Sequence, residues 1–174
     1  MANKMKYYEK YPISTIIQVH ILNLLVYLTG AYIMFRLHLI TGILYLIYIV
    51  LLEFFVYKQA CPHCYYYGKR CFSGRGLIAP LLYKKGDPKK FCSRPIKFTN
   101  LIPQTLVVAV PVIVGIALLI SRGFHLLTLI AILYPILHWF AANPIIFGKL
   151  ACPHCKQGKK CCPALNYFSK KKKK

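Results

Sequence analysis

Acidic residues are nearly missing from this chain, which has only three of them among its 174 residues: Glu9, Glu53 and Asp87. A pair of neighbouring carboxylates is a common machinery of acid–base hydrolysis, so this scarcity argues against that reaction class. The sequence also lacks a phosphate-binding P-loop, a dinucleotide-binding fingerprint and a serine nucleophile motif. No common enzyme class is therefore indicated by a motif.

Basic and apolar residues, in contrast, are both abundant. The chain carries 24 Lys and Arg residues, a formal net charge of +21, and is 57% hydrophobic. A soluble domain of this size could not remove so much apolar surface from water, whereas long apolar runs separated by basic loops suit a membrane protein. Because membrane topology by itself requires basic loops, the charge does not imply nucleic acid, and we expect none as a partner.

Four apolar segments are long enough to cross a bilayer, whose hydrocarbon core of about 30 Å needs about 20 helical residues. They cover residues 13–35, 37–57, 101–120 and 124–147. Of the 24 Lys and Arg residues, 22 lie outside the two short turns, which hold only Arg36 and Arg122. Positive charge gathers on the cytoplasmic side, so we predict an all-α, multi-pass protein of the cell membrane with both termini and the central loop in the cytoplasm.

A five-residue motif, Ala-Cys-Pro-His-Cys, occurs twice, at residues 60–64 and 151–155. Each copy follows a predicted helical hairpin, so we predict two tandem repeats in one membrane domain. They are 1–100, with the hairpin 13–57, and 101–174, with the hairpin 101–147. The two repeats have the same orientation in the membrane, which indicates a pseudo-twofold axis along the membrane normal.

All eight cysteines fall in the predicted cytoplasmic segments. In a reducing compartment, Cys-x2-Cys pairs favour metal ligation over structural disulfides. We predict two four-cysteine sites, one per repeat, because the third Cys recurs at a similar distance in both. Their ligands are Cys61, Cys64, Cys71 and Cys92 in the first repeat and Cys152, Cys155, Cys161 and Cys162 in the second. An alternative is one shared site formed by Cys61, Cys64, Cys152 and Cys155 across the pseudo-axis.

Three chemistries suit these cysteines. Iron–sulfur clusters are favoured, because irregular spacing suits them and eight thiolates fill two four-iron sites. Structural zinc is the second, since Cys-Pro-x-Cys pairs are common zinc knuckles. A redox-active dithiol is the third, because Cys-Pro-His-Cys is also a redox sequence. We expect His63 and His154 to lie outside the ligand set, with a site of three cysteines and one histidine as the alternative.

Polar residues inside the predicted spans form a second candidate site. His20, Glu53 and His138 are expensive to bury in lipid, so they form either a metal or proton site or a set of hydrogen bonds between helices. His125 and His138, 13 residues apart on one predicted helix, resemble the paired histidines of membrane b-type cytochromes. That resemblance implies haem b, with His38 opposite His125 and His20 opposite His138.

The favoured functional prediction is electron transfer between an acidic soluble partner and a membrane carrier. The alternative is a zinc-stabilised membrane scaffold without redox activity. Metal transport is a third possibility, weakened because no Cys lies within a span to pass a soft metal along. Residues 84–90 and 170–174 are rich in lysine, which predicts contact with anionic lipid headgroups of the bilayer.

Overall fold

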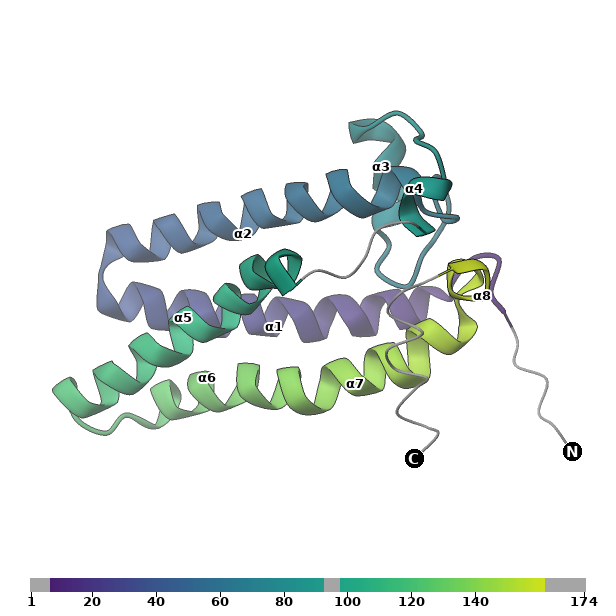
Figure 1. The fold of residues 1–174 in the computed structure, drawn as a ribbon. Coiled ribbons are helices and arrows are strands. Elements are labelled where there is room, and N and C mark those ends of the chain that lie inside the picture. The colour runs from purple at the N-terminus through teal and green to yellow at the C-terminus, as the bar shows by residue number, and fades with distance from the viewer. Residues whose placement is uncertain (1–6, 93–97, 162–174) are drawn as a thin grey trace, which may run out of the picture. The chain divides into compact units, whose positions relative to one another are not determined.

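The computed structural model describes residues 7–92 and 98–161, which are almost entirely helical (Figure 1). Within these residues the only strand-like feature is an isolated bridge between Tyr8 and Cys155. Four helices are long and apolar enough to span a membrane. They cover Ile13–Leu37, Leu39–His63, Leu101–Arg122 and Leu126–His154. For the described residues, the predictions of an all-helical chain and of four segments long and apolar enough to cross a membrane are confirmed, and the second and fourth segments extend several residues further than predicted.

The chain divides into two compact units that cut across the two predicted repeats. The first, here called the thiol unit, contains the described residues 7–20, 55–92 and 143–161. The second, the helical unit, contains the described residues 21–54 and 98–142. Each unit therefore combines segments from both halves of the sequence.

The helical unit contains most of four long helices: α1 (Ile13–Leu37), α2 (Leu39–Ala60), α5 (Phe98–Arg122) and α6 (Leu126–Leu137). Apolar side chains fill two small cores between them. One contains Ala31, Met34, Tyr45, Ile49, Leu52 and Val107, and the other contains Ile33, Leu118, Ala131 and Ile132. No more than 28% of the most apolar window of any span is buried, which leaves the remaining apolar surface for lipid.

Inside this unit, a tyrosine hydroxyl replaces a backbone hydrogen-bond donor that a proline removes. Pro111 lies within α5 and has no N–H, so the carbonyl of Val107 loses its donor in the helix. The hydroxyl of Tyr45 donates to that carbonyl oxygen at 2.9 Å from the neighbouring helix α2. A backbone group that lipid could not satisfy is thus satisfied by a side chain.

The fourth span changes its helical register twice. After α6, residues His138–Ala142 form a π-helical turn (η2), followed by α7 (Asn143–Ile145) and a second π-helical stretch, η3 (Ile146–Ala151). Pro135 and Pro144 remove two backbone donors from this region, which is the usual cause of such irregularity. Wider helical turns of this kind occur often at functional sites.

Three short helices complete the thiol unit: α3 (Arg75–Leu82), α4 (Lys89–Cys92) and α8 (Lys156–Cys161). They follow the two Cys-Pro-His-Cys motifs in the chain. These motifs and their surroundings form the candidate site.

Candidate thiol site

The two Cys-Pro-His-Cys motifs adopt the same local conformation. Each begins with a single 3-10 turn, η1 (Cys61–His63) and η4 (Cys152–His154), with proline in its first turn where a missing N–H costs nothing. The amide of Cys64 donates to the carbonyl of Cys61 at 3.3 Å, and the matching bond from Cys155 to Cys152 is 3.2 Å. The repeated sequence thus gives a repeated turn, and we call the two the CPHC turns.

The chain segments after the two CPHC turns lie against each other. The amide of Tyr65 donates to the side-chain oxygen of Gln157 at 2.8 Å, and the amide of Lys156 donates to the Tyr66 hydroxyl at 3.0 Å. Glu9 accepts a hydrogen bond from Tyr65 and pairs with the ammonium of Lys156. Gln157 is only 3% exposed, so this contact is part of the packed interior of the thiol unit.

The N-terminal segment that contains Tyr8 and Tyr11, here called the N-terminal strap, hydrogen-bonds with residues of both repeats in or next to the CPHC turns. The amide of Tyr8 donates to the carbonyl of His154 at 3.0 Å, and the Tyr8 carbonyl accepts from the Tyr66 hydroxyl at 2.7 Å. Tyr11 is fully buried, and its hydroxyl donates to the carbonyl of Ala151 at 2.6 Å. The sequence interpretation missed these tyrosines, because in a chain with 14 of them nothing marks two as structural.

The sulfur atoms gather around this tyrosine core. Cys71 is buried with Tyr11 and Tyr66, and Cys64 and Cys155 pack against the same cluster. Cys61 and Cys152 are buried as well, each 9% exposed. Cysteines from both CPHC turns therefore share one neighbourhood, and none of these five forms a disulfide among the described residues.

Backbone amides point at two of the sulfurs. The amide of Gly76 donates to the sulfur of Cys71 at 3.3 Å, and the Ser73 hydroxyl lies 3.5 Å from the same atom. The amide of Tyr66 hydrogen-bonds with Cys64 and favours its ionised form. Amide donors of this kind stabilise thiolates and are a regular feature of metal–thiolate centres.

Burial opposes ionisation of Cys64 and outweighs its amide donor. Desolvation raises the pKa of the Cys64 thiol to about 12, and the nearby Cys155, Cys71 and Cys61 add to the rise. Desolvation, together with Cys155 and Tyr66, also raises the pKa of the Tyr11 hydroxyl. At neutral pH Cys64 is therefore a neutral thiol, whereas a catalytic dithiol needs a lowered pKa.

The histidines of the two motifs have separate neighbours. The Nδ1 atom of His63 lies 3.0 Å from the carbonyl oxygen of Asp87, and the amide of Gly86 donates to the carbonyl of Pro62 at 3.0 Å. The ring of His154 packs on the ring of Tyr8, with 4.9 Å between centroids. His63 thus connects its CPHC turn with the basic segment that follows α3.

No metal site is already assembled in the part of the chain that the structure describes. Across residues 7–92 and 98–161, no three Cys, His, Asp or Glu side chains are placed to hold a metal ion together. Cys92 and Cys161 end the helices α4 and α8, and Cys162 lies outside the described residues. The two predicted four-cysteine sites and the shared alternative therefore all stay predictions.

The predicted intramembrane residues each have their own surroundings. Glu53 accepts a hydrogen bond from the Tyr27 hydroxyl at 2.8 Å. His138 is 6% exposed and begins the π-helical turn η2. Among the described residues its Nε2 atom is the one buried side-chain nitrogen or oxygen without a hydrogen-bond partner. His20 belongs to the thiol unit, where its Nε2 atom is close to Gly74.

The histidines of the two short turns are exposed. His38 lies between α1 and α2, and its Nδ1 atom accepts a hydrogen bond from the amide of Ile40 at 3.2 Å. His125 directly precedes α6. Haem binding by His20, His38, His125 and His138 stays a prediction.

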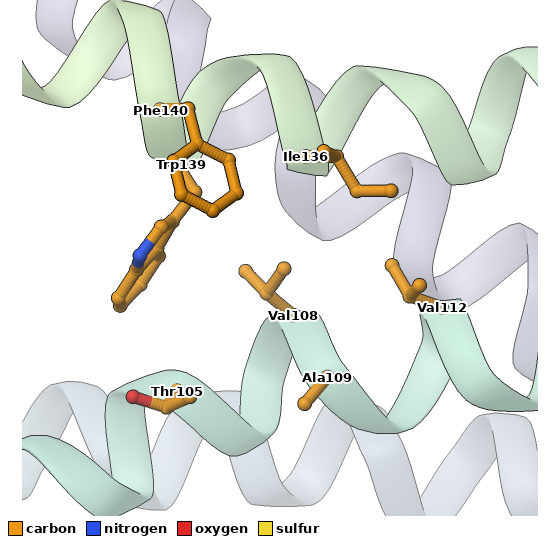
Figure 2. A pocket seen from close by; sticks show the side chains of 7 residues that line it. All are labelled: Thr105, Val108, Ala109, Val112, Ile136, Trp139 and Phe140. Carbon is orange, nitrogen blue, oxygen red and sulfur yellow. The ribbon is translucent and has the colours of Figure 1, made fainter.

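An apolar groove lies between α5 and the fourth span in the helical unit (Figure 2). It has a volume of about 140 Å³ and is lined by Thr105, Val108, Ala109, Val112, Ile136, Trp139 and Phe140. Sites for organic ligands usually measure about 300–1,000 Å³, so this groove is too small for a haem.

Comparison of the chain with protein-family models, with curated proteins and with solved structures gives no match.

Proposed function

We propose that this chain is a multi-pass membrane protein whose two CPHC turns together bind one metal ion through Cys61, Cys64, Cys152 and Cys155. The observation that carries the proposal is that Cys64 and Cys155, one from each turn, pack against the same buried cluster of Tyr11, Tyr66 and Cys71. Removing the thiol protons would let a cation draw these sulfurs together, since metal and proton compete for the same lone pairs.

Burial of Cys64 favours a metal over a catalytic dithiol. A thiol whose pKa is about 12 is a poor nucleophile at neutral pH, but a bound cation would stabilise its thiolate. The Tyr66 amide that hydrogen-bonds with Cys64 would support the same charge. The environment thus suits a thiolate that exists only when a metal is bound.

Zinc suits this shared centre best. Two Cys-x2-Cys pairs are the ligand set of four-cysteine structural zinc sites. One zinc ion would fasten the segment after α2 to the segment after the fourth span. The protein would then be a zinc-stabilised membrane scaffold that presents its thiol unit at the membrane surface.

Iron–sulfur electron transfer is the second candidate. Cys64 and Cys155 are half-buried, whereas Cys61, Cys71 and Cys152 are buried. A cluster held there would have one accessible edge, which an acidic soluble partner could approach through the surrounding lysines. The cluster would then pass electrons from this soluble partner to a membrane carrier, as the sequence predicts.

Elemental analysis of protein purified without oxygen separates these candidates. A shared zinc site predicts one zinc per chain and a colourless protein. An iron–sulfur centre predicts iron, acid-labile sulfide and visible absorbance. Protein that stays folded with neither metal, and binds neither when both are supplied, would overturn the proposal.

We also propose that both termini and the thiol unit are cytoplasmic, because the N-terminal segment, the central loop and the C-terminal segment together hold 22 of the 24 Lys and Arg residues. Epitope tags at residues 1 and 174 should resist protease added to intact cells. Cleavage of either tag from outside would place the cysteines in an oxidising space and remove the basis of the metal centre.

A further inference from the structure

Helix α3 (Arg75–Leu82) has one buried side and one exposed apolar side. Gly76 and Ala79 are buried against the rest of the thiol unit. The opposite side exposes Leu77, Ile78, Leu81 and Leu82, and Leu81 is 84% exposed. Four large, exposed apolar side chains on a helix of two turns form an apolar patch, and such a patch usually contacts a membrane or another molecule.

The thiol unit fixes the direction of this apolar face. The amide of Gly68 donates to the carbonyl of Gly76 at 2.8 Å. A Cβ atom at residue 76 would collide with the backbone carbonyl oxygens of Tyr66 and Lys69. Helix α3 therefore packs against the loop after the first CPHC turn as closely as a backbone can, and its outer face has no freedom to turn inward.

The start of α3 is beside the end of a membrane span. The guanidinium of Arg75 lies over the ring of Tyr57, 5.9 Å from its centroid, and Tyr57 belongs to the last turns of α2. The span that includes α2 ends at His63. The first residue of α3 thus contacts the last turns of a candidate membrane span.

A basic segment follows α3 directly. Lys84, Lys85, Lys89 and Lys90 are all exposed. The single acid among them, Asp87, is engaged at the start of α4, where its carboxylate accepts a hydrogen bond from the Lys89 amide at 2.8 Å. An exposed apolar helix face followed by four lysines is the pattern of a segment that lies in an anionic membrane surface.

We propose that α3 is an interfacial helix, which lies in the surface of the bilayer with its Leu and Ile side chains at the acyl boundary. Lys84, Lys85, Lys89 and Lys90 then contact anionic headgroups. This inference rests on the membrane insertion proposed above and not on the bound metal. It assigns the exposed face to lipid and makes the thiol unit part of the membrane surface.

Charge and position favour lipid over a second copy of the chain. Two α3 faces packed together would bring two sets of four lysines near each other, and such like charges repel. Helix α3 also lies in the loop between the candidate span that ends at His63 and the one that begins at Leu101, so a bilayer around these spans would be close to it. Anionic headgroups offer the opposite charge without a further partner.

Tryptophan fluorescence gives a direct test, because the chain has a single Trp, Trp139, in the fourth span. The variant Trp139→Phe/Leu81→Trp places the only indole on α3, and Ile78→Trp in the same background is a second probe of that face. Each full-length protein is reconstituted in vesicles that contain phosphatidylcholine brominated along its acyl chains. The wild-type protein, with Trp139, reports independently whether the spans are inserted.

We expect the Leu81→Trp indole to be quenched by brominated lipid to about half or more of the extent seen for Trp139, and to be shielded from acrylamide. Quenching should increase when equimolar phosphatidylglycerol is added, and this increase should vanish when all four lysines are changed to Gln. Wild-type Trp139 that is not quenched would refute membrane insertion itself.

Two results with a quenched Trp139 would overturn only the interfacial helix. If acrylamide reaches both α3 probes while brominated lipid does not, water covers this face. If neither quencher reaches them, protein covers it, as a second copy or another subunit would. A folded thiol unit is verified in each variant by resistance of the 60–92 segment to trypsin.

Discussion

The thiol unit and the helical unit are stabilised by different kinds of interaction. In the helical unit, apolar side chains fill two small cores, and tyrosine hydroxyls satisfy backbone carbonyls of neighbouring helices. In the thiol unit, segments distant in sequence bind each other through their backbones, as Tyr8 binds His154 and Tyr11 binds Arg70. The packing of the helical unit needs apolar side chains, which many different sequences could supply. The fold of the thiol unit needs a few specific hydrogen bonds, each between two particular residues.

The largest expected effect concerns the reactivity of a thiol. Burial raises the pKa of Cys64 to about 12, from 9.0 for an exposed thiol. In metal-free protein at pH 8, iodoacetamide should alkylate Cys64 about a thousandfold more slowly than the same residue in unfolded chain. Peptide mass spectrometry after timed quenching measures both rates.

The same pKa predicts how the stability of the metal-free thiol unit depends on pH. Because the pKa of Cys64 is higher in the folded state than in the unfolded state, the unfolded chain loses its thiol proton first as the pH rises. The contribution of Cys64 to stability is therefore fully present below pH 9 and is lost as the pH rises from 9 toward 12. Equal alkylation rates in folded and unfolded protein would show that Cys64 is exposed and that burial does not raise its pKa.

A glycine substitution tests the tight packing of the thiol unit. Gly76→Ala places a Cβ atom in collision with the backbone oxygens of Tyr66 and Lys69, so we expect a loss of about 1–3 kcal/mol in the stability of this unit. Trypsin cleavage after Lys69 and Arg70 should become much faster. Gly148→Ala is the matched control, because a Cβ there meets no atom within 4 Å. Equal protection of both variants would contradict the close approach of α3.

A smaller effect is expected from one hydrogen bond in the helical unit. Tyr45→Phe removes the donor from the Val107 carbonyl, which Pro111 leaves without its helical partner, at a cost of about 1 kcal/mol. In a Pro111→Ala background the helix supplies its own donor, so the same Tyr45→Phe change should cost little. Unfolding in mixed micelles measures the double-mutant cycle, and a coupling energy of zero would show that the tyrosine does not replace the missing amide.

The sequence predicted the helical unit well because hydropathy acts over whole segments. Residues 13–35 and 101–120 correspond closely to the first and third spans, and a shift of a residue or two at their ends changes nothing in the burial of apolar surface. The fourth span ends later than expected. Its π-helical turns carry the helix through Pro144, which from sequence alone lies near a helix end.

The candidate site was predicted only in part, since its contacts are specific and long-range. The two copies of the CPHC motif adopt the same turn, whereas the two separate sites that the recurring third Cys favoured stay a prediction. Periodicity carries no sign that Tyr8 and Tyr11 would strap these turns together or that Cys155 would lie near Cys64. The exposed apolar face of α3 was also missed, because its eight residues are too few for a hydropathy signal.

The metal content of paired cysteine variants tests the shared centre most directly. One variant carries Cys61→Ser/Cys64→Ser and another Cys152→Ser/Cys155→Ser, with Cys92→Ser as the control that removes a ligand only from the two-site arrangement. Since the ligands of one centre act together, each double variant should lose essentially all bound metal, while Cys92→Ser keeps it. If each double variant instead keeps about half of the metal and Cys92→Ser also loses about half, the protein has two independent centres and the shared site is refuted.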